Sequence, residues 1–88
     1  MINNNINTIP SDAIIYIGAK WCGPCKQMKP LAESSNKEIY YIDADENQEL
    51  ISNDNVRSIP TLIVLKDGKE LKRSSGSLSK IQFDIFLN

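Results

Sequence analysis

The chain has 88 residues and a formal net charge of −1, from ten Lys and Arg against eleven Asp and Glu. This length predicts one small domain over residues 1–88, and the 41% share of hydrophobic residues is typical of a globular protein rather than a disordered one. Because the charges nearly balance, we expect no strong electrostatic attraction to nucleic acid or to an anionic membrane.

The N-terminal segment, residues 1–12, is polar and has no regular hydrophobic period. We expect it to form an arm or a weak edge strand. Its first five residues carry no Lys or Arg, whereas a secretory signal begins with a positively charged region. The longest apolar run, Ala13 to Ala19, is far shorter than the ~20 residues of a membrane helix. The sequence therefore predicts a cytoplasmic protein without a membrane partner.

The middle of the chain alternates strand and helix patterns. Residues 13–17 form a nearly continuous β-branched run, which predicts a central strand buried on both faces. Residues 23–36 favour a helix, with a bend at Pro30. Residues 39–42 predict a second strand, and the acidic residues after it suit the beginning of a short helix over 46–53.

The last third of the chain predicts a hairpin and a closing helix. Residues 61–65 form a third strand pattern, and Asp67-Gly68 before residues 70–73 is a typical turn for an antiparallel hairpin. Ser77 or Ser79 can cap the final helix. We expect its buried stripe to consist of Leu78, Ile81 and Ile85, with Phe86 beside them. The element order predicts an α/β fold, its sheet covered on both faces.

The run Trp21-Cys22-Gly23-Pro24-Cys25 lies between the first buried strand and the first helix. A helix N-terminus presents unpaired N–H groups and the positive end of the helix dipole, and both favour a thiolate at Cys22. Cys22 is therefore the predicted nucleophile. Cys25 follows one helical turn deeper, within reach of a disulfide, while Gly23 and Pro24 keep the turn compact. The pattern predicts a reversible, redox-active disulfide.

Three other uses of two cysteines fit less well. A structural disulfide across three residues closes too small a loop to stabilise the fold appreciably. A zinc site needs further ligands, and the chain has two Cys and no His. Inert buried cysteines would not explain why both stand at the beginning of a helix. We therefore expect redox chemistry without a metal or any cofactor beyond the disulfide itself.

In these motifs the chain resembles the thioredoxin family. The matching residues run in order from residues 19–26 through Pro30, Ile59-Pro60-Thr61 and Asp67-Gly68 to Gly76. The resemblance implies a central mixed sheet of four or five strands, flanked by helices and ending in an antiparallel hairpin and a C-terminal helix. It also implies a cis peptide bond before Pro60, which would face the disulfide. The polar segment 1–12 leaves little room for the first strand and helix of the family, so we expect a short member.

The resemblance also implies a mechanism and a substrate site. Cys22 would attack a disulfide in a protein substrate, and Cys25 would resolve the mixed disulfide. An apolar groove formed by Trp21, Ile59, Pro60 and Gly76 would bind the substrate; the alternative for Trp21 and Ile59 is simple core packing. A monomer recycled by a thioredoxin-reductase-type or glutathione-linked electron donor is expected.

The chain departs from the family pattern beside the cysteines. Tyr16 stands where the family usually has a buried aspartate, and Tyr41 corresponds to the lysine that partners it. We hypothesise that the two tyrosines approach each other under the site and that water deprotonates Cys25, although both rings could simply fill the core. Gly18 replaces an aromatic residue that commonly shields the site.

Three functions remain open at this stage. The first is a thiol-disulfide oxidoreductase that reduces protein disulfides, a sense that Pro24 between the cysteines favours by analogy with the family. The second is a glutaredoxin-like protein recycled by glutathione. The third is a non-catalytic subunit that binds a partner enzyme through a thioredoxin-like fold.

Overall fold

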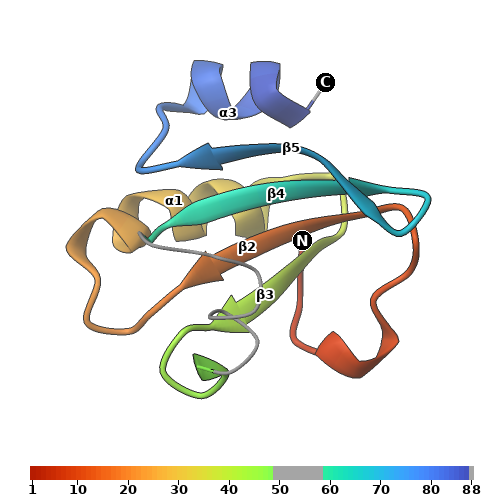
Figure 1. Ribbon diagram of the computed structural model, residues 1–88. Helices are drawn as coiled ribbons and strands as arrows, with labels where there is room; N and C mark the ends of the chain where they lie inside the picture. Colours follow the sequence, from red (N-terminus) through yellow and green to blue (C-terminus); the bar gives the residue numbers. More distant parts are fainter. Residues whose placement is uncertain (49–58, 88) are drawn as a thin grey trace.

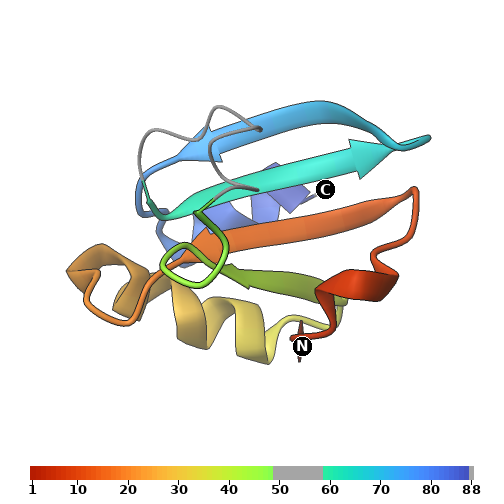
Figure 2. The same ribbon diagram turned by 60° about the horizontal axis from the view of Figure 1, so that its bottom comes forward.

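The computed structural model describes residues 1–48 and 59–87, and these form a five-stranded sheet with two helices (Figures 1 and 2). The elements are β1 (Ile2–Asn3), the 3-10 helix η1 (Ile6–Thr8), β2 (Ala13–Gly18), α1 (Gly23–Ser34), β3 (Ile39–Asp43), β4 (Thr61–Lys66), β5 (Lys69–Ser75) and α3 (Lys80–Leu87). The strand order is β1-β3-β2-β4-β5.

Strand β2 lies at the centre of the sheet and connects its parallel and antiparallel halves. It pairs in parallel with β3, with Tyr16 opposite Tyr41, and antiparallel with β4, with Tyr16 opposite Leu62. The crossover from β2 to β3 passes through α1, as parallel pairing requires a long connection. The mixed α/β sheet expected from the sequence is therefore confirmed.

The two faces of the sheet carry two separate apolar clusters, because successive side chains of a strand point to opposite faces. One cluster joins Tyr16 and Leu62 of the sheet to Met28 of α1 and Phe83 of α3. The other contains Ile15, Ile17, Tyr40, Ile42 and Ile63, against which Ile6 and Ile9 of the N-terminal segment pack. Within the described residues, α1 and α3 thus cover the same face of the sheet.

The N-terminal segment combines an edge strand with a short turn. Ile2 and Asn3 pair in parallel with Ile39 and Tyr40, so β1 is the weak edge strand that the sequence predicted as one possibility. Two residues after β1, Asn5 begins the path into η1, and its N–H bonds to the side chain of Asn3 at 2.8 Å.

The hairpin between β4 and β5 turns at Asp67 and Gly68. Both have positive φ, 55° and 77°, which the tight two-residue turn demands and which glycine adopts at little cost. The N–H of Asp67 also bonds to Asp12 Oδ1 at 2.8 Å, which ties the turn to the segment before β2. The predicted antiparallel hairpin is confirmed, with β5 extending over Lys69–Ser75.

Helix α3 corrects one expectation. Its cap is as predicted, since Ser79 Oγ accepts a bond from the N–H of Gln82, and Gln82 Oε1 accepts one from the N–H of Ser79. The predicted stripe is wrong at Ile81 and Ile85, which are 72% and 69% exposed while Phe83 is buried. Its other members, Leu78 and Phe86, do pack against the core. The bulkier aromatic ring fills the space over the sheet, which turns the two isoleucines toward solvent.

Two further sequence predictions concern the extent of helices. Helix α1 ends at Ser34 rather than near Asn36. The predicted short helix over 46–53 lies mostly in residues 49–58, outside the described residues. In the described part of the chain, no helix has the length and apolar character needed to span a membrane.

Candidate functional site

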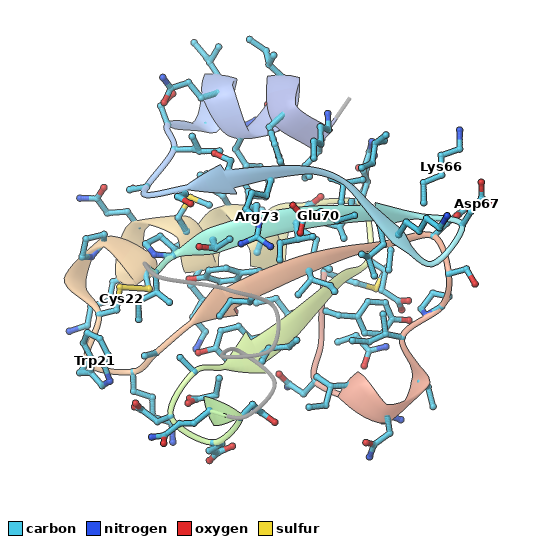
Figure 3. All side chains as sticks on the ribbon, in the orientation of Figure 1. Trp21, Cys22, Lys66, Asp67, Glu70 and Arg73 are labelled. Atoms are coloured by element: carbon cyan, nitrogen blue, oxygen red, sulfur yellow. A yellow bond between two sulfur atoms is a disulfide. The ribbon has the colours of Figure 1, made fainter. Side chains whose placement is uncertain are left out.

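The two cysteines form a disulfide where β2 gives way to α1. Cys22 is the N-cap of α1 and Cys25 lies in its first turn, with Cα atoms 5.2 Å apart. Both residues are buried. Figure 3 shows Trp21 and the Cys22 sulfur at one end of the sheet, and Lys66 and Asp67 at the other. The hairpin and the disulfide therefore lie at opposite ends of β4.

The local sequence explains why the helix begins at this disulfide. Cys22 has extended backbone geometry, φ −79° and ψ 112°, and Pro24 in the first turn has the φ that a helix requires and no N–H to satisfy. The N–H of Cys25 donates to Cys22 Sγ at 3.2 Å. The sulfur of Cys22 thus occupies the position of an N-capping acceptor, where a negative charge is favoured.

Trp21 presents its ring to solvent beside the disulfide. The residue is 67% exposed, and its Nε1–H donates to Asp45 Oδ2 at 2.7 Å. Asp45 follows β3, whose C-terminal end lies next to the end of β2, with Gly18 opposite Asp43. Asp43 Oδ1 in turn accepts the N–H of Asp45 at 2.9 Å. This turn fixes the carboxylate that orients the indole ring.

A cis peptide bond joins Ile59 to Pro60, directly before β4. In both views the beginning of β4 lies beside the first turn of α1 (Figures 1 and 2). Pro60 is fully buried, and its carbonyl accepts the N–H of Gly76 at 2.8 Å. Ile59 packs against the cluster that contains both cysteines. The structure thus brings Ile59, Pro60 and Gly76 together near the disulfide.

The loop that carries Gly76 is anchored to α1. Gly76 has φ +93°, a conformation that favours glycine, and a Cβ at this position would meet nothing within 4 Å. Two residues later, the N–H of Leu78 donates to Met28 Sδ at 3.2 Å, and Ser77 Oγ bonds to Gln27 Oε1 at the same distance. These contacts fix the main chain of Gly76 beside Pro60, with free space where a Cβ would lie.

Tyr16 and Tyr41 lie under the first turn of α1. Their ring centroids are 5.3 Å apart in an edge-to-face arrangement, and Tyr16 Oη donates to the main-chain oxygen of Cys25 at 2.9 Å. Burial first, and then the neighbouring Tyr41, raises the pKa of Tyr16 to about 12. Tyr16 is therefore a neutral hydrogen-bond donor at physiological pH, not a base.

Gly18 leaves space for this arrangement. A Cβ at Gly18 would lie 3.2 Å from Tyr16 Oη and 3.3 Å from Cys25 Sγ, tighter than ordinary contacts. A pocket of about 210 Å³ opens nearby, lined by Tyr16, Ala19, Lys20, Cys25, Lys26, Lys29 and Tyr41. The missing side chain at Gly18 thus allows the tyrosine hydroxyl and the sulfur of Cys25 to approach a common point.

Sequence reasoning missed two groups of this site. The first is Asp45, whose signal was available, because parallel strands bring the loops after β2 and β3 to one edge of the sheet. The second is the set Lys20, Lys26 and Lys29, which reach one pocket from a loop and from one side of α1. Their spacing indicates a shared face of the helix only for Lys26 and Lys29, so the sequence alone gives a weak signal.

Comparison with known proteins decides the family. A family model described as thioredoxin matches residues 2–88. The chain belongs to the thioredoxin family. Within this family it is 48% identical over 64 residues to thioredoxin from Bacillus subtilis and 35% identical over 91 residues to thioredoxin C-3 from Corynebacterium nephridii. These matches cover 66% and 98% of the chain.

The matched part of this family member is shorter than its relatives. It spans 62% of the Bacillus subtilis protein and 63% of thioredoxin C-3. Among solved structures, a mutant thioredoxin from Halobacterium salinarum superimposes with a TM-score of 0.75 at 31% identity, covering 86% of this chain and 71% of that one. Thioredoxin from Fasciola hepatica gives 0.78 at 28% identity, covering 90% and 80%. The thioredoxin fold therefore persists in the shorter matched part.

Proposed function

We propose that the chain is a protein-disulfide reductase of the thioredoxin type, which acts through Cys22 and Cys25. One observation carries the proposal: the two sulfurs form a disulfide at the N-terminus of α1, where the N–H of Cys25 points at Cys22 Sγ. An N–H donor and the helix dipole both favour the thiolate of Cys22 once the disulfide is reduced. Family membership supports this redox function over a glutaredoxin-like protein or a non-catalytic subunit.

The proposed reaction transfers two electrons in two exchange steps. The Cys22 thiolate attacks one sulfur of the substrate disulfide, and the other substrate sulfur leaves as a thiolate. The thiolate of Cys25 then attacks Cys22 Sγ, which forms the Cys22–Cys25 disulfide and releases the second substrate thiolate. The substrate is reduced and the protein is oxidised. Turnover therefore needs an electron donor, either of the thioredoxin-reductase type or linked to glutathione.

The substrate site that we propose consists of Trp21, Ile59, Pro60 and Gly76. An exposed indole ring supplies apolar contact area at low entropic cost. Main-chain groups beside Pro60, next to the open backbone of Gly76, could pair with an extended substrate segment, as in strand addition. Disulfide-containing proteins with an extended segment near the disulfide are therefore the proposed substrates.

The reducing role also implies a compartment. Thiols of a reductant persist where glutathione and thioredoxin systems keep cysteines reduced, as in the cytoplasm. We propose a cytoplasmic monomer, because each exchange step needs only the two cysteines of one chain.

A turnover assay tests the proposal. Insulin-type disulfide reduction with dithiothreitol is measured for the unmodified protein, for Cys22→Ser and for Lys66→Gln, which changes a side chain at the opposite end of β4 from the disulfide. We expect activity in the first and third proteins and its loss in Cys22→Ser. No activity in the unmodified protein would overturn the proposal in favour of a binding subunit. Replacing dithiothreitol by a thioredoxin-reductase system or by a glutathione system then identifies the donor.

A further inference from the structure

The pocket beside Cys25 has an unusual set of charges for a place where a thiol must lose its proton. Its lining contains three basic side chains, Lys20, Lys26 and Lys29, and two phenols, Tyr16 and Tyr41. No carboxylate lines this pocket in the described part of the chain. Within the same residues, no carboxylate forms an ion pair with any of the three lysines. The charge that faces Cys25 across the pocket is therefore positive.

Neither tyrosine can accept the proton of Cys25. The Tyr16 hydroxyl donates a hydrogen bond to the Cys25 carbonyl. It keeps its proton up to a pH of about 12, because burial raises the pKa of Tyr16 that far. The pKa of Tyr41 is also raised, by burial and then by Asp43, Glu46 and Asp45. A protonated lysine is no base either. The pocket volume of about 210 Å³, with lysine and tyrosine side chains in its lining, leaves room for water as the acceptor.

We propose that one pocket takes the place of a buried base for Cys25. It is formed by Lys20, Lys26, Lys29, Tyr16 and Tyr41 and is called here the lysine pocket. Water in the lysine pocket takes the proton of Cys25, and the ammonium groups of the lysines stabilise the resulting thiolate. This inference rests on the proposed reductase function, in which Cys25 attacks the mixed disulfide. Positive charge near a thiol favours its ionised form, so the lysines raise the fraction of Cys25 ready to attack. Tyr16 is a positioning residue that holds the Cys25 main chain against β2.

Other titratable groups lie around the lysine pocket and modulate it. Lys20 and Tyr41 also border a neighbouring hollow with Asp43 and Glu46, while Lys29 and Tyr41 border one with Glu33 and Met1. The groups to be considered come from five segments. They are, from β2, Tyr16; from β3 and the turn after it, Tyr41, Asp43, Asp45 and Glu46; from the loop before α1, Lys20 and Cys22; from α1, Lys26, Lys29 and Glu33; and from the N-terminus, Met1. The carboxylates among these groups line the neighbouring hollows and not the pocket that contains Cys25, so we expect them to weaken the effect of the lysines.

The titration of Cys25 tests the proposal directly. In the Cys22→Ser variant Cys25 is the only cysteine, because the chain has two. Nuclear magnetic resonance of a carbon-13 label at Cβ follows its ionisation with pH. We compare this variant with one that adds Lys20→Gln, Lys26→Gln and Lys29→Gln. A matched control instead adds Lys66→Gln, Lys69→Gln and Lys80→Gln, which removes the same charge from residues that do not line the pocket.

We expect the pocket substitutions to raise the titration midpoint of Cys25 by about half a pH unit, and the control to leave it nearly unchanged. Potassium chloride at about 1 M should mimic the pocket substitutions with all lysines in place, because salt screens exposed charges. Equal shifts in both triple variants, or no shift in either and none with salt, would overturn the proposal. The salt arm uses native lysines, so it stands even if a variant folds poorly.

A kinetic readout separates this inference from the proposed function. With both cysteines present, the pocket substitutions should slow the resolution of a mixed disulfide at neutral pH about threefold, while the first attack by Cys22 keeps its rate. If the unmodified protein reduces no disulfide, the function fails, yet the titration of Cys25 still reports on the lysines. If reduction proceeds and the titration midpoint of Cys25 does not change when the lysines are replaced, only the inference fails.

Discussion

The hydroxyl of Tyr16 donates a hydrogen bond to the main-chain oxygen of Cys25 at 2.9 Å, across the interface between β2 and α1. Both residues are buried in the cluster that also holds Cys22 and Met28. The bond therefore fixes the first turn of α1, and Cys25 with it, against the central strand.

Removing this hydroxyl should destabilise the oxidised protein. Tyr16→Phe loses one buried hydrogen bond, and we expect the free energy of unfolding to fall by about 1 kcal/mol. Urea denaturation measures the change. Tyr40→Phe is the matched control, because its hydroxyl bonds to the exposed side chain of Glu38, and it should cost less. Equal stability of Tyr16→Phe and the unmodified protein, together with an unchanged rate of disulfide reduction, would leave the hydroxyl without a role.

The raised pKa of Tyr16 predicts how stability depends on alkaline pH. Below pH 10 the phenol keeps its proton in both the folded and the unfolded chain, so it adds no pH dependence. From pH 10 to about 12 only the folded chain keeps it, so the free energy of unfolding should fall as pH rises. Denaturation at a series of pH values measures this slope. Tyr16→Phe should flatten it, leaving a remainder from Tyr40 and Tyr41, whose pKa values are also raised. An identical slope in both proteins contradicts the assignment.

A methyl group at Gly18 should disturb the site. In Gly18→Ala the new Cβ would press on Tyr16 Oη and Cys25 Sγ, and we expect a loss of about 1–3 kcal/mol in unfolding free energy, as for other overpacked cores. Gly23→Ala is the control, because a Cβ there meets nothing within 4 Å and alanine favours the helix. Thermal and urea denaturation compare the two. Gly18→Ala as stable as Gly23→Ala would show that the space beside Cys25 is larger than described.

Trp21 should matter for substrate binding and little for stability. Because its ring is exposed, Trp21→Ala should change the free energy of unfolding by less than about 1 kcal/mol while raising KM for a protein disulfide several-fold. Leu71→Ala is the matched control, since Leu71 is 61% exposed on β5 and lies outside the proposed groove. Steady-state kinetics with insulin give both values. A KM that rises equally in both variants would argue against a specific role for the indole.

Local patterns predicted the parts of the fold whose geometry depends on neighbouring residues. The β-branched run before Gly18 and the Asp67-Gly68 turn each define their own backbone, so β2 and the hairpin agree with the prediction. The N-cap of α3 at Ser79 follows the same logic. The other features of the fold depend on contacts between distant segments of the chain. Helix α3 is apolar on several sides, so only its packing on the sheet selects Phe83 over Ile81 and Ile85.

The candidate site shows the same division. The sequence alone predicted the cysteine pair at a helix N-terminus, because both the strand and the helix pattern are local. The bond from Trp21 to Asp45 joins residues 24 positions apart, and the bond from Tyr16 ends on a main-chain oxygen that has no sequence signature. The lysine pocket likewise collects residues from a loop and a helix around two strands. Such features depend on tertiary packing and become visible only in the folded chain.

We propose that Cys22 attacks the substrate and that Cys25 resolves the intermediate. The most direct measurement is mass spectrometry of the mixed disulfide that Cys25→Ser forms with a disulfide-containing protein, with Cys22→Ser treated in parallel. We expect that Cys25→Ser accumulates a covalent adduct through Cys22, that a reducing agent releases this adduct, and that Cys22→Ser forms little of it. An adduct that accumulates on Cys25 in Cys22→Ser, with none on Cys22 in Cys25→Ser, would contradict the assigned roles.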